Sequence, residues 1–551
     1  MNTRLKQYVD IYTVSEDAKG HVGLKFDFFV SFKMNCSLST IGRPLQGFSF
    51  EGLFAEYTHL NSTCPKNSTI FFKETGMLTV ESCRIMTGTP NSIWTGWTPY
   101  PIEDIWTRIV TWKLPLFQLA VQFPRVPLGF NVETATVIHL LGDPVDSLMS
   151  VLFTLATCHS RACLAKEICK ESGLKEDDRD YVFTWKALAL VMVSYDECGK
   201  SYQVQGFCRD YVTSRRHPEY ESEIRHIYEE TANCLAADRA TKSLPVFVAE
   251  SFFIGGWLIA LLKAALSEPS SNNWPNVEVH SIAFSGMYLW ITSAVVLGSL
   301  IGASQTEGSI PRLLQAFEYQ LTQVHGQLSR RPSATHREES GWCKTGIERA
   351  IHGGLNNWRP RKWSSRQRSL DISNWQMVSY VMVALIALGA SFLTAIVLSN
   401  FVPPHGMNCR HIPQTVMLTI WLVSFLLECG FELWLPQGLF WAVYCKDMIA
   451  ALMNVGTIVI TQWGIMNSCA CWSMWGMRGL HLPQMLDVKH ELMHYTRHVA
   501  PWITFMAILF QFLFCAAIIW RYWDAVRVYI QRDDMMSNRG WKKRKTADMQ
   551  C

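Results

Sequence analysis

Six apolar segments constrain this chain more than any other feature of its sequence. Each is close to the length of about 20 residues that a helix needs to cross the hydrocarbon core of a bilayer. They cover 244–266, 281–303, 375–398, 413–435, 447–466 and 502–520. So many segments of this length are hard to bury inside a soluble protein. The sequence therefore predicts an all-α integral membrane protein, a six-span helical bundle with an N-terminal region of amphipathic helices.

Composition supports a membrane protein and excludes several other classes. Charged residues make up 17 % of the 551 residues, against about 25 % in a typical soluble domain. The net charge of +4 is too small to indicate nucleic acid as a partner. No phosphate-binding loop, dinucleotide-binding glycine pattern, nucleophile elbow, haem spacing or iron–sulfur spacing is present. We therefore expect no cofactor, and neither an ATP-driven pump nor a dinucleotide-binding enzyme.

The distribution of Lys and Arg predicts the orientation of the spans, since cytosolic loops are enriched in both residues. Segment 304–374 holds 11 Lys and Arg against 6 Asp and Glu, whereas 267–280 holds neither Lys nor Arg. The tail after the last span carries eight Lys and Arg, a density that favours contact with anionic lipids. The pattern places 304–374, 436–446 and 521–551 in the cytosol, and 267–280, 399–412 and 467–501 on the opposite side. Whether the membrane is the plasma membrane or an endomembrane stays open.

The predicted organisation follows from these spans. Residues 1–104 form an N-terminal region of uncertain side, and 105–243 form an amphipathic, cytosolic helical region. Spans one and two occupy 244–303, and a basic cytosolic loop covers 304–374. Spans three to six occupy 375–520, and a basic cytosolic tail covers 521–551.

Glycosylation sequons near the N-terminus oppose a cytosolic location for it. Asn35, Asn61 and Asn67 begin sequons, which are used only on the exoplasmic side. A glycoprotein would therefore need a seventh crossing before residue 158. The segment 135–157 is long enough, but Asp143 and Asp146 within it weigh against insertion into lipid. We expect a cytosolic N-terminal region with unused sequons.

Ionisable residues inside spans mark candidate functional sites, because a charge in the bilayer is costly. Glu428 lies deep in the fourth span, Glu432 lies one turn further on, and Lys446 and Asp447 begin the fifth span. The short segment 436–446 brings Glu432 and Lys446 close enough for an ion pair that holds the two helices together. The alternative is a proton or cation relay through Glu428. Asp447, Asn454 and Thr461 belong to a polar stripe on the fifth span, which either lines a path or bonds to neighbouring helices. Near the ends of the first span, Glu250 and Lys263 can both reach the interface by snorkelling.

One short motif resembles a zinc protease signature. His490, Glu491 and His494 fit H-E-x-x-H, in which two His on one helical face hold zinc and the Glu activates water. Charged residues surround the motif, and no third ligand is evident in the sequence. A catalytic zinc needs three protein ligands, so we expect no stoichiometric zinc. The alternative is an amphipathic, His-rich helix at the membrane surface.

Three stretches together resemble a group of multipass membrane proteins of filamentous fungi. They are PRVPLGFNVETATVIHLLGDPVDSL at 124–148, HSIAFSGMYLWITSAVVLGSLIGASQTEGSIPRLL at 280–314 and TQWGIMNSCACWS at 461–473. The resemblance covers about residues 105–530 and implies a fungal integral membrane protein without an assigned reaction. Some such proteins lie near genes of secondary metabolism. The resemblance therefore implies an accessory role in the biosynthesis or transport of secondary metabolites.

Three classes of function remain open from the sequence. The first is a transporter, channel or lipid-handling protein that works through Glu428 and the polar stripe, with a hydrophobic small molecule as its partner. The second is a membrane enzyme, either a metalloprotease at the H-E-x-x-H motif or a carboxylate-driven cyclase of a hydrophobic metabolite. The third is a scaffold without chemistry of its own. Whether the chain is an enzyme stays undecided.

Overall fold

The protein is a helical bundle, as the sequence predicts. The computed structural model describes residues 31–33, 69–71, 106, 110, 114–124, 130–176, 179–197, 218–240, 243–266, 282–304, 309–328, 373–401, 411–434, 439–462 and 493–530. Nearly all of them are helical, which confirms the all-α class. The helices before the third predicted span are α6 (Leu114–Val121), α7 (Phe130–Gly142), α8 (Pro144–Glu171), α9 (Arg179–Glu197), α11 (Pro218–Asp238), α12 (Ser243–Leu266), α14 (Trp290–Ile301) and α15 (Ser309–Leu328).

The remaining helices form the second half of the bundle. They are α18 (Asn374–Asn400), α19 (His411–Trp434), α20 (Leu439–Gln462), the π-helical turn η6 (Tyr495–Val499), α23 (Ala500–Arg521) and α24 (Trp523–Ile530). The capping box of Ser373 and Gln376 begins α18, because each side chain bonds the backbone N–H of the other residue. Four short strands form two antiparallel pairs: β1 (Ser31–Lys33) with β2 (Thr69–Phe71), and β3 (Arg239–Ala240) with β4 (Ala303–Ser304).

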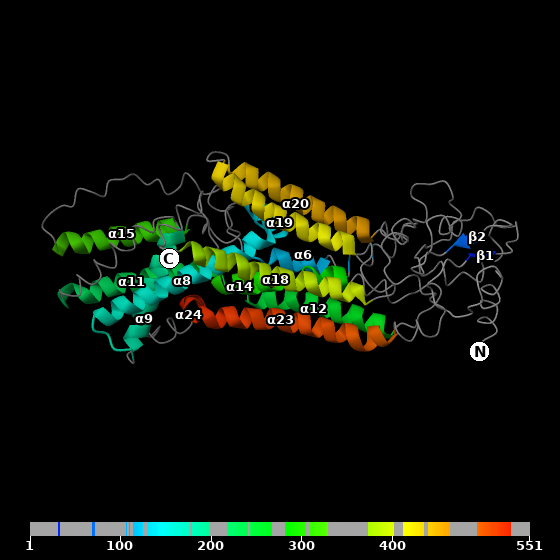
Figure 1. Ribbon diagram of the computed structural model, residues 1–551. Helices are drawn as coiled ribbons and strands as arrows, with labels where there is room; N and C mark the ends of the chain where they lie inside the picture. The colour runs from blue at the N-terminus through cyan, green and yellow to red at the C-terminus, as the bar shows by residue number, and fades with distance from the viewer. Residues whose placement is uncertain are drawn as a thin grey trace.

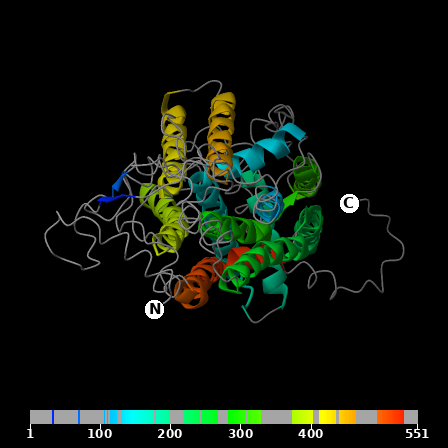
Figure 2. The same ribbon diagram turned by 90° about the vertical axis from the view of Figure 1, so that its right-hand side faces the viewer.

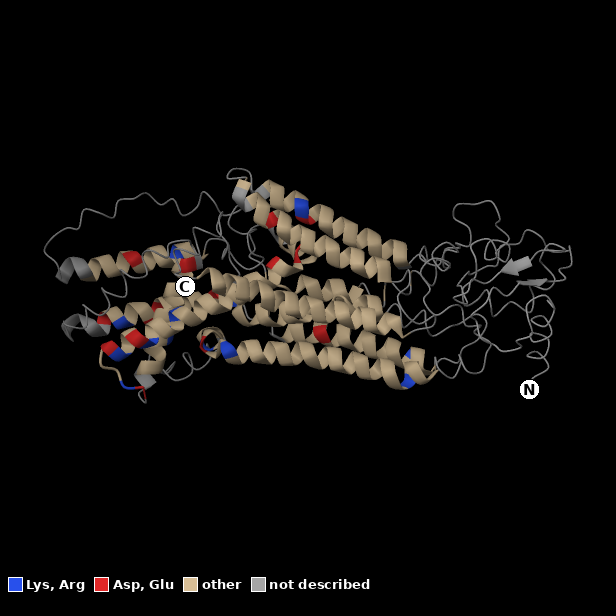
Figure 3. Ribbon diagram, viewed as in Figure 1, with Lys and Arg blue, Asp and Glu red and all other residues tan. Residues whose placement is uncertain are grey.

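The described helices divide into an apolar part and a charged part. Helices α12, α14, α18, α19, α20 and α23 run alongside one another in the apolar part (Figure 1). Charged side chains gather at one end, on α9, α11, α15 and the second half of α8 (Figure 3). Helices α19 and α20 lie side by side on one flank, away from α12 and α23 (Figures 1 and 2). The separation is typical of a membrane bundle with a water-facing helical extension at one end.

Side-chain exposure fits a bilayer around the apolar part. Large apolar side chains are exposed on α12, α18, α19, α20 and α23, where lipid can contact them. Five exposed Trp, typical of the membrane interface, lie where α18, α19, α20 and α23 meet the charged end: Trp375, Trp434, Trp441, Trp520 and Trp523. The second predicted span, by contrast, is 89 % buried over its apolar window. It therefore forms the centre around which the other spans pack.

Among the described residues, seven helices are long and apolar enough to span a membrane, one more than the six expected. The additional helix is α8, whose first half is apolar and whose second half carries the charges of the water-facing end. Asp143 and Asp146 weighed against a crossing here, but both are buried and have partners. Asp143 contacts the ammonium group of Lys446, and Asp146 contacts the imidazole of His139. Pairing removes most of the cost of an intramembrane carboxylate. Helices α6 and α7 also pack against α12, α14 and α20, so residues 105–243 do not form one separate amphipathic region.

The last turn of α7 lies directly against α20. A Cβ atom added to Gly142 would lie 2.6 Å from the carbonyl oxygen of Asp447 and 3.0 Å from its Cα. Side-chain carbons do not approach backbone atoms so closely, so only glycine permits this contact. The contact places the end of α7 between α19 and α20, where the candidate site forms.

We expect Gly142→Ala to destabilise the protein by about 1–3 kcal/mol, because the added methyl group must push α7 away from α20. The measurement is the midpoint of thermal unfolding of the full-length protein in detergent. Gly456→Ala on α20 is the matched control, since nothing lies within 4 Å of a Cβ atom there. Equal midpoints for the two variants would contradict the close packing of α7 on α20.

The Lys/Arg distribution predicts that the charged end faces the cytosol, and exposed positions at both ends test this. Tyr319 on α15 marks the charged end, and His494 beside η6 marks the other. In a background without other reactive cysteines, Tyr319→Cys should react with a membrane-impermeant maleimide only after permeabilisation, and His494→Cys before it. One observation favours the opposite orientation. Cys234 on α11, at the charged end, is disulfide-bonded, and disulfide bonds are typical of oxidising compartments outside the cytosol. Labelling of Tyr319→Cys from outside would reverse the predicted orientation.

Candidate functional site: a buried cluster at a helix break

The chain breaks its helix inside the bundle, between α7 and α8. Pro144 occupies the first position of α8 and has no N–H, and Asp143 caps the helix by accepting a hydrogen bond from the N–H of Asp146 at 3.0 Å. The side chain of Asp143 is fully buried. A helix N-terminus carries a partial positive charge and unpaired N–H groups. The break therefore favours acidic side chains at a depth where they are otherwise unfavourable.

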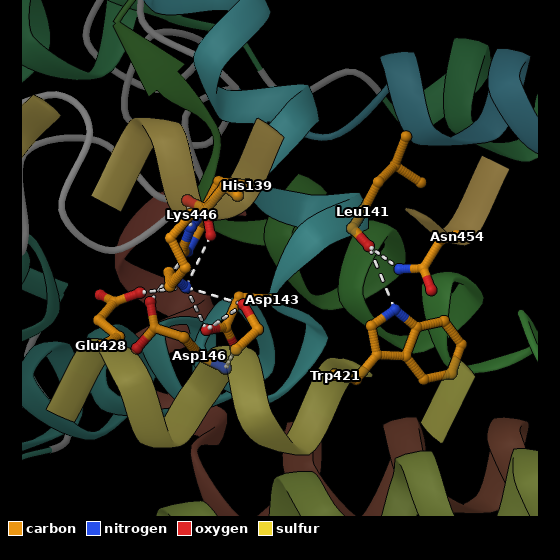
Figure 4. A network of polar contacts seen from close by, with 10 residues as sticks. His139, Leu141, Asp143, Asp146, Trp421, Glu428, Lys446 and Asn454 are labelled. Atoms are coloured by element: carbon orange, nitrogen blue, oxygen red, sulfur yellow. Dashed lines mark hydrogen bonds and ion pairs between the residues drawn. The ribbon is translucent and has the colours of Figure 1, made fainter. Parts of the chain in front are cut away.

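The break also frees a carbonyl group at the end of α7. The carbonyl oxygen of Leu141 accepts hydrogen bonds from Trp421 Nε1 at 3.2 Å and from Asn454 Nδ2 at 3.3 Å (Figure 4). A buried backbone carbonyl without a partner costs free energy. Asn454 thus stabilises the broken helix, and this supports the interhelical alternative for the polar stripe at that position. Thr461, further along the stripe, bonds to Thr457 of its own helix at 2.6 Å.

Lys446 lies at the centre of the cluster. Its ammonium group contacts Oδ2 of Asp143 at 2.7 Å, Oε2 of Glu428 at 3.0 Å and Oδ1 of Asp447 at 2.7 Å (Figure 4). It also donates to Ser424 Oγ at 2.9 Å. The side chain of Lys446 is only 3 % exposed, so solvent does not screen these contacts. The ammonium group therefore joins the helix break to both α19 and α20.

His139 joins a second pair of carboxylates. Its Nδ1 lies 2.7 Å from Oδ2 of Asp447, and its Nε2 lies 2.9 Å from Oδ2 of Asp146. Carboxylate oxygens accept hydrogen bonds, so an imidazole between two of them bonds both only when each nitrogen carries a proton. The geometry therefore favours the imidazolium form of His139.

The cluster contains more acids than bases. Four carboxyl groups, those of Asp143, Asp146, Glu428 and Asp447, surround the two cationic groups of Lys446 and His139. Among the described residues, full ionisation of these six groups gives two more negative than positive charges, and none of their side chains is more than 3 % exposed. An uncompensated buried charge costs several kcal/mol or more. The arrangement thus favours binding of a proton or a cation.

Two groups within the cluster also have the spacing of metal ligands. Asp143, Glu428 and Asp447 each offer an oxygen within 4.8 Å of the others, as do the ligand atoms of His139, Asp146 and Glu428. The Lys446 ammonium contacts all three carboxylates of the first group. It thus serves as a covalently attached counter-ion where a metal ion would otherwise balance the charge.

The sequence identified only part of this cluster. Glu428 was a candidate, and the structure pairs it with Lys446, whereas the sequence favoured Glu432 as the partner of that lysine. The side chain of Glu432 lies outside the described part of the chain. Asp143 and Asp146 were missed because their charges argued against a span instead of indicating a site within one, and His139 was not considered. Their shared signal was an acidic, His-containing segment of sufficient length for a span.

A second buried carboxyl group lies elsewhere in the bundle. Glu250 on α12 is 6 % exposed, so the expectation that it snorkels to the interface is wrong. The polar side chain beside its carboxyl group is that of Thr292 on α14. Lys263, near the other end of α12, is exposed, as snorkelling requires.

The remaining candidate residues lie mostly outside the described part of the chain. His490, Glu491 and the sequons at Asn35, Asn61 and Asn67 fall there, so the zinc and glycosylation hypotheses stay predictions. His494 is exposed, and its ring centroid lies 5.1 Å from that of His498. Within the residues that the structure describes, His494 belongs to no group of three potential metal ligands.

We expect Lys446→Met to destabilise the protein by about 3–5 kcal/mol, because it leaves buried carboxylates without their cation. The measurements are the amount of protein in the membrane and the midpoint of thermal unfolding in detergent. Combining it with Asp143→Asn, which removes one of those charges, should recover part of the loss. Lys263→Met replaces an exposed lysine on α12 and should change stability by less than about 0.5 kcal/mol. Equal effects of the two single substitutions would show that the cluster carries no net buried charge.

Comparisons with protein families, curated proteins and solved structures found no similar protein. The resemblance to fungal membrane proteins therefore stays a prediction, and the buried cluster is the basis for a functional hypothesis.

Proposed function

We propose that this protein is a multipass membrane transporter that binds and releases protons at the buried cluster. One observation carries the proposal. At the helix break, the described residues bring together four carboxyl groups but only two cationic groups. Ionisable residues at such positions mark proton relays and ion pathways in membrane proteins. Interrupted helices are likewise a recurrent feature of transporter binding sites.

The proposed coupling acts through the pairing of α7 and α8 with α19 and α20. Protonation of Glu428 would remove one of the carboxylates that hold Lys446, and so weaken the attachment of α19 to α20. Protonation of Asp146 would remove a partner of His139 at the start of α8. A proton that binds more tightly in one arrangement of these helices shifts the population toward that arrangement. The break at Asp143 gives the chain a position at which such a shift can occur.

The cargo that we propose is a hydrophobic small molecule, in a role accessory to secondary metabolism. Support for this finer statement comes from the resemblance of 124–148, 280–314 and 461–473 to fungal membrane proteins. The lipid bilayer is the environment in which such a molecule would be handled, and the seven apolar helices indicate that environment.

A membrane enzyme is the second candidate, because the same groups can perform acid–base chemistry. His139 between two carboxylates is an arrangement that can donate or accept a proton during a reaction. A carboxylate-driven cyclase would use a buried acid of this kind on a hydrophobic metabolite. The experiment below separates the two candidates, since an enzyme changes the identity of a metabolite and a transporter changes its distribution.

We expect expression of the protein to change the distribution of at least one small molecule between cells and medium. The measurement is untargeted mass spectrometry of both fractions. Glu428→Gln should abolish the change while the protein level stays normal, and a protonophore should abolish it in the unaltered protein. Glu223→Gln, an exposed carboxylate on α11, is the matched control and should leave the change intact. Redistribution that survives both Glu428→Gln and the protonophore would exclude the cluster, and a new chemical species would favour the enzyme.

A further inference from the structure

A second group of potential ligands lies where the last span joins the charged end. His159 and Cys163 are four residues apart on α8, so their side chains lie on one face of the helix. Asp524 is in the first turn of α24, which packs beside α8. One ligand atom of each residue lies within 4.8 Å of the other two. The three residues thus come together only through the contact between α8 and α24.

The spacing of the first two ligands agrees with one bound metal ion. Cys163 Sγ lies 3.7 Å from His159 Nε2. Zinc binds sulfur at about 2.3 Å and nitrogen at about 2.0–2.1 Å in tetrahedral geometry, which puts these ligands about 3.6 Å apart. The thiol and the imidazole therefore already have the separation that a shared zinc ion requires.

The surroundings leave the ligand atoms available. Nε2 of His159 faces the Cys163 thiol, which a metal ion between the two atoms would replace as its partner. The ring packs edge-on against Tyr522, with the ring centroids 5.8 Å apart. Lys166 contacts Oδ1 of Asp524 at 2.6 Å, which fixes the carboxylate and leaves its second oxygen for a metal. Cys163 is exposed, so water can reach a fourth coordination position.

We propose that His159, Cys163 and Asp524 bind a zinc ion that fastens α24 to α8. A thiolate, an imidazole and a carboxylate suit zinc, whereas calcium and magnesium prefer oxygen ligands only. On binding, the Cys163 thiol releases its proton to water and the sulfur bonds to the metal. The thiolate and carboxylate then balance the two positive charges of zinc.

Zinc would add to contacts that already join these helices. Cys158 Sγ lies 3.1 Å from the hydroxyl of Tyr529, and Lys166 pairs with Asp524. All of these contacts connect α8 with α24, which directly follows the span α23. The proposed ion therefore couples the end of a span to the charged end of the bundle. This role is independent of proton binding at the cluster around Lys446.

The test uses the full-length protein in detergent, stripped of metal by a chelator and then titrated with Co²⁺ and Zn²⁺. We expect one equivalent of Co²⁺ to bind and to give the near-ultraviolet absorption of a cobalt–thiolate bond. Cys163→Ser should abolish this absorption, and His159→Gln or Asp524→Asn should weaken binding at least about tenfold. Zn²⁺ should raise the unfolding temperature of the unaltered protein but not that of Cys163→Ser.

Two controls keep the outcome decisive. Cys429→Ser removes an exposed cysteine on α19 and should leave the cobalt signal unchanged. His494→Gln alters the H-E-x-x-H motif and should also leave it unchanged. Absence of stoichiometric binding, a thiolate signal that survives Cys163→Ser, or loss of binding in His494→Gln would each overturn the proposal. Comparable unfolding temperatures of metal-free Cys163→Ser and the metal-free unaltered protein would show that the substitution itself does not unfold the chain.

Discussion

The buried ammonium group of Lys446 is the interaction on which the arrangement of the apolar part depends. It contacts carboxylates from α19, from α20 and from the break between α7 and α8. Helices α19 and α20 lie on one flank of the bundle, so these contacts fix how that flank meets α7 and α8. Aromatic packing attaches the same flank to the second span, since Trp421 of α19 lies edge-on to Tyr288 and to Trp290 of α14.

A helix break deep in the bundle requires replacement of the bonds that it removes. Asp143 supplies an acceptor for the first turn of α8, and Trp421 and Asn454 supply donors for the last turn of α7. Bringing charged groups into the bundle for this purpose carries a desolvation cost that a continuous apolar helix avoids. Such a cost is typical of functional sites, where stability is reduced in favour of a particular chemistry. The excess of carboxyl groups among the described residues is the reason why we propose that this chemistry involves a bound proton.

The two proposed sites differ because their surroundings differ. The cluster around Lys446 is closed to water, so its charges must balance among themselves or through a bound proton. The group of His159, Cys163 and Asp524 is partly exposed, so a metal ion can enter it from solution. In our proposals, protonation of the first site changes how α19 and α20 attach to α7 and α8. Zinc at the second site fastens α24, which follows the last span, to α8.

The sequence by itself determined the fold class, because apolar segments of bilayer length fold as spanning helices wherever they occur. It also indicated Glu428, since a carboxylate within such a segment is exceptional. Only the tertiary structure showed that Asp143 and Asp146, which weighed against a seventh span at α8, are buried beside Lys446 and His139. A charge counts against membrane insertion until its partner is known, and Lys446, the cationic partner of Asp143, is 303 residues away in the sequence. For the same reason the ligand set of His159, Cys163 and Asp524 became visible only when α24 was placed beside α8.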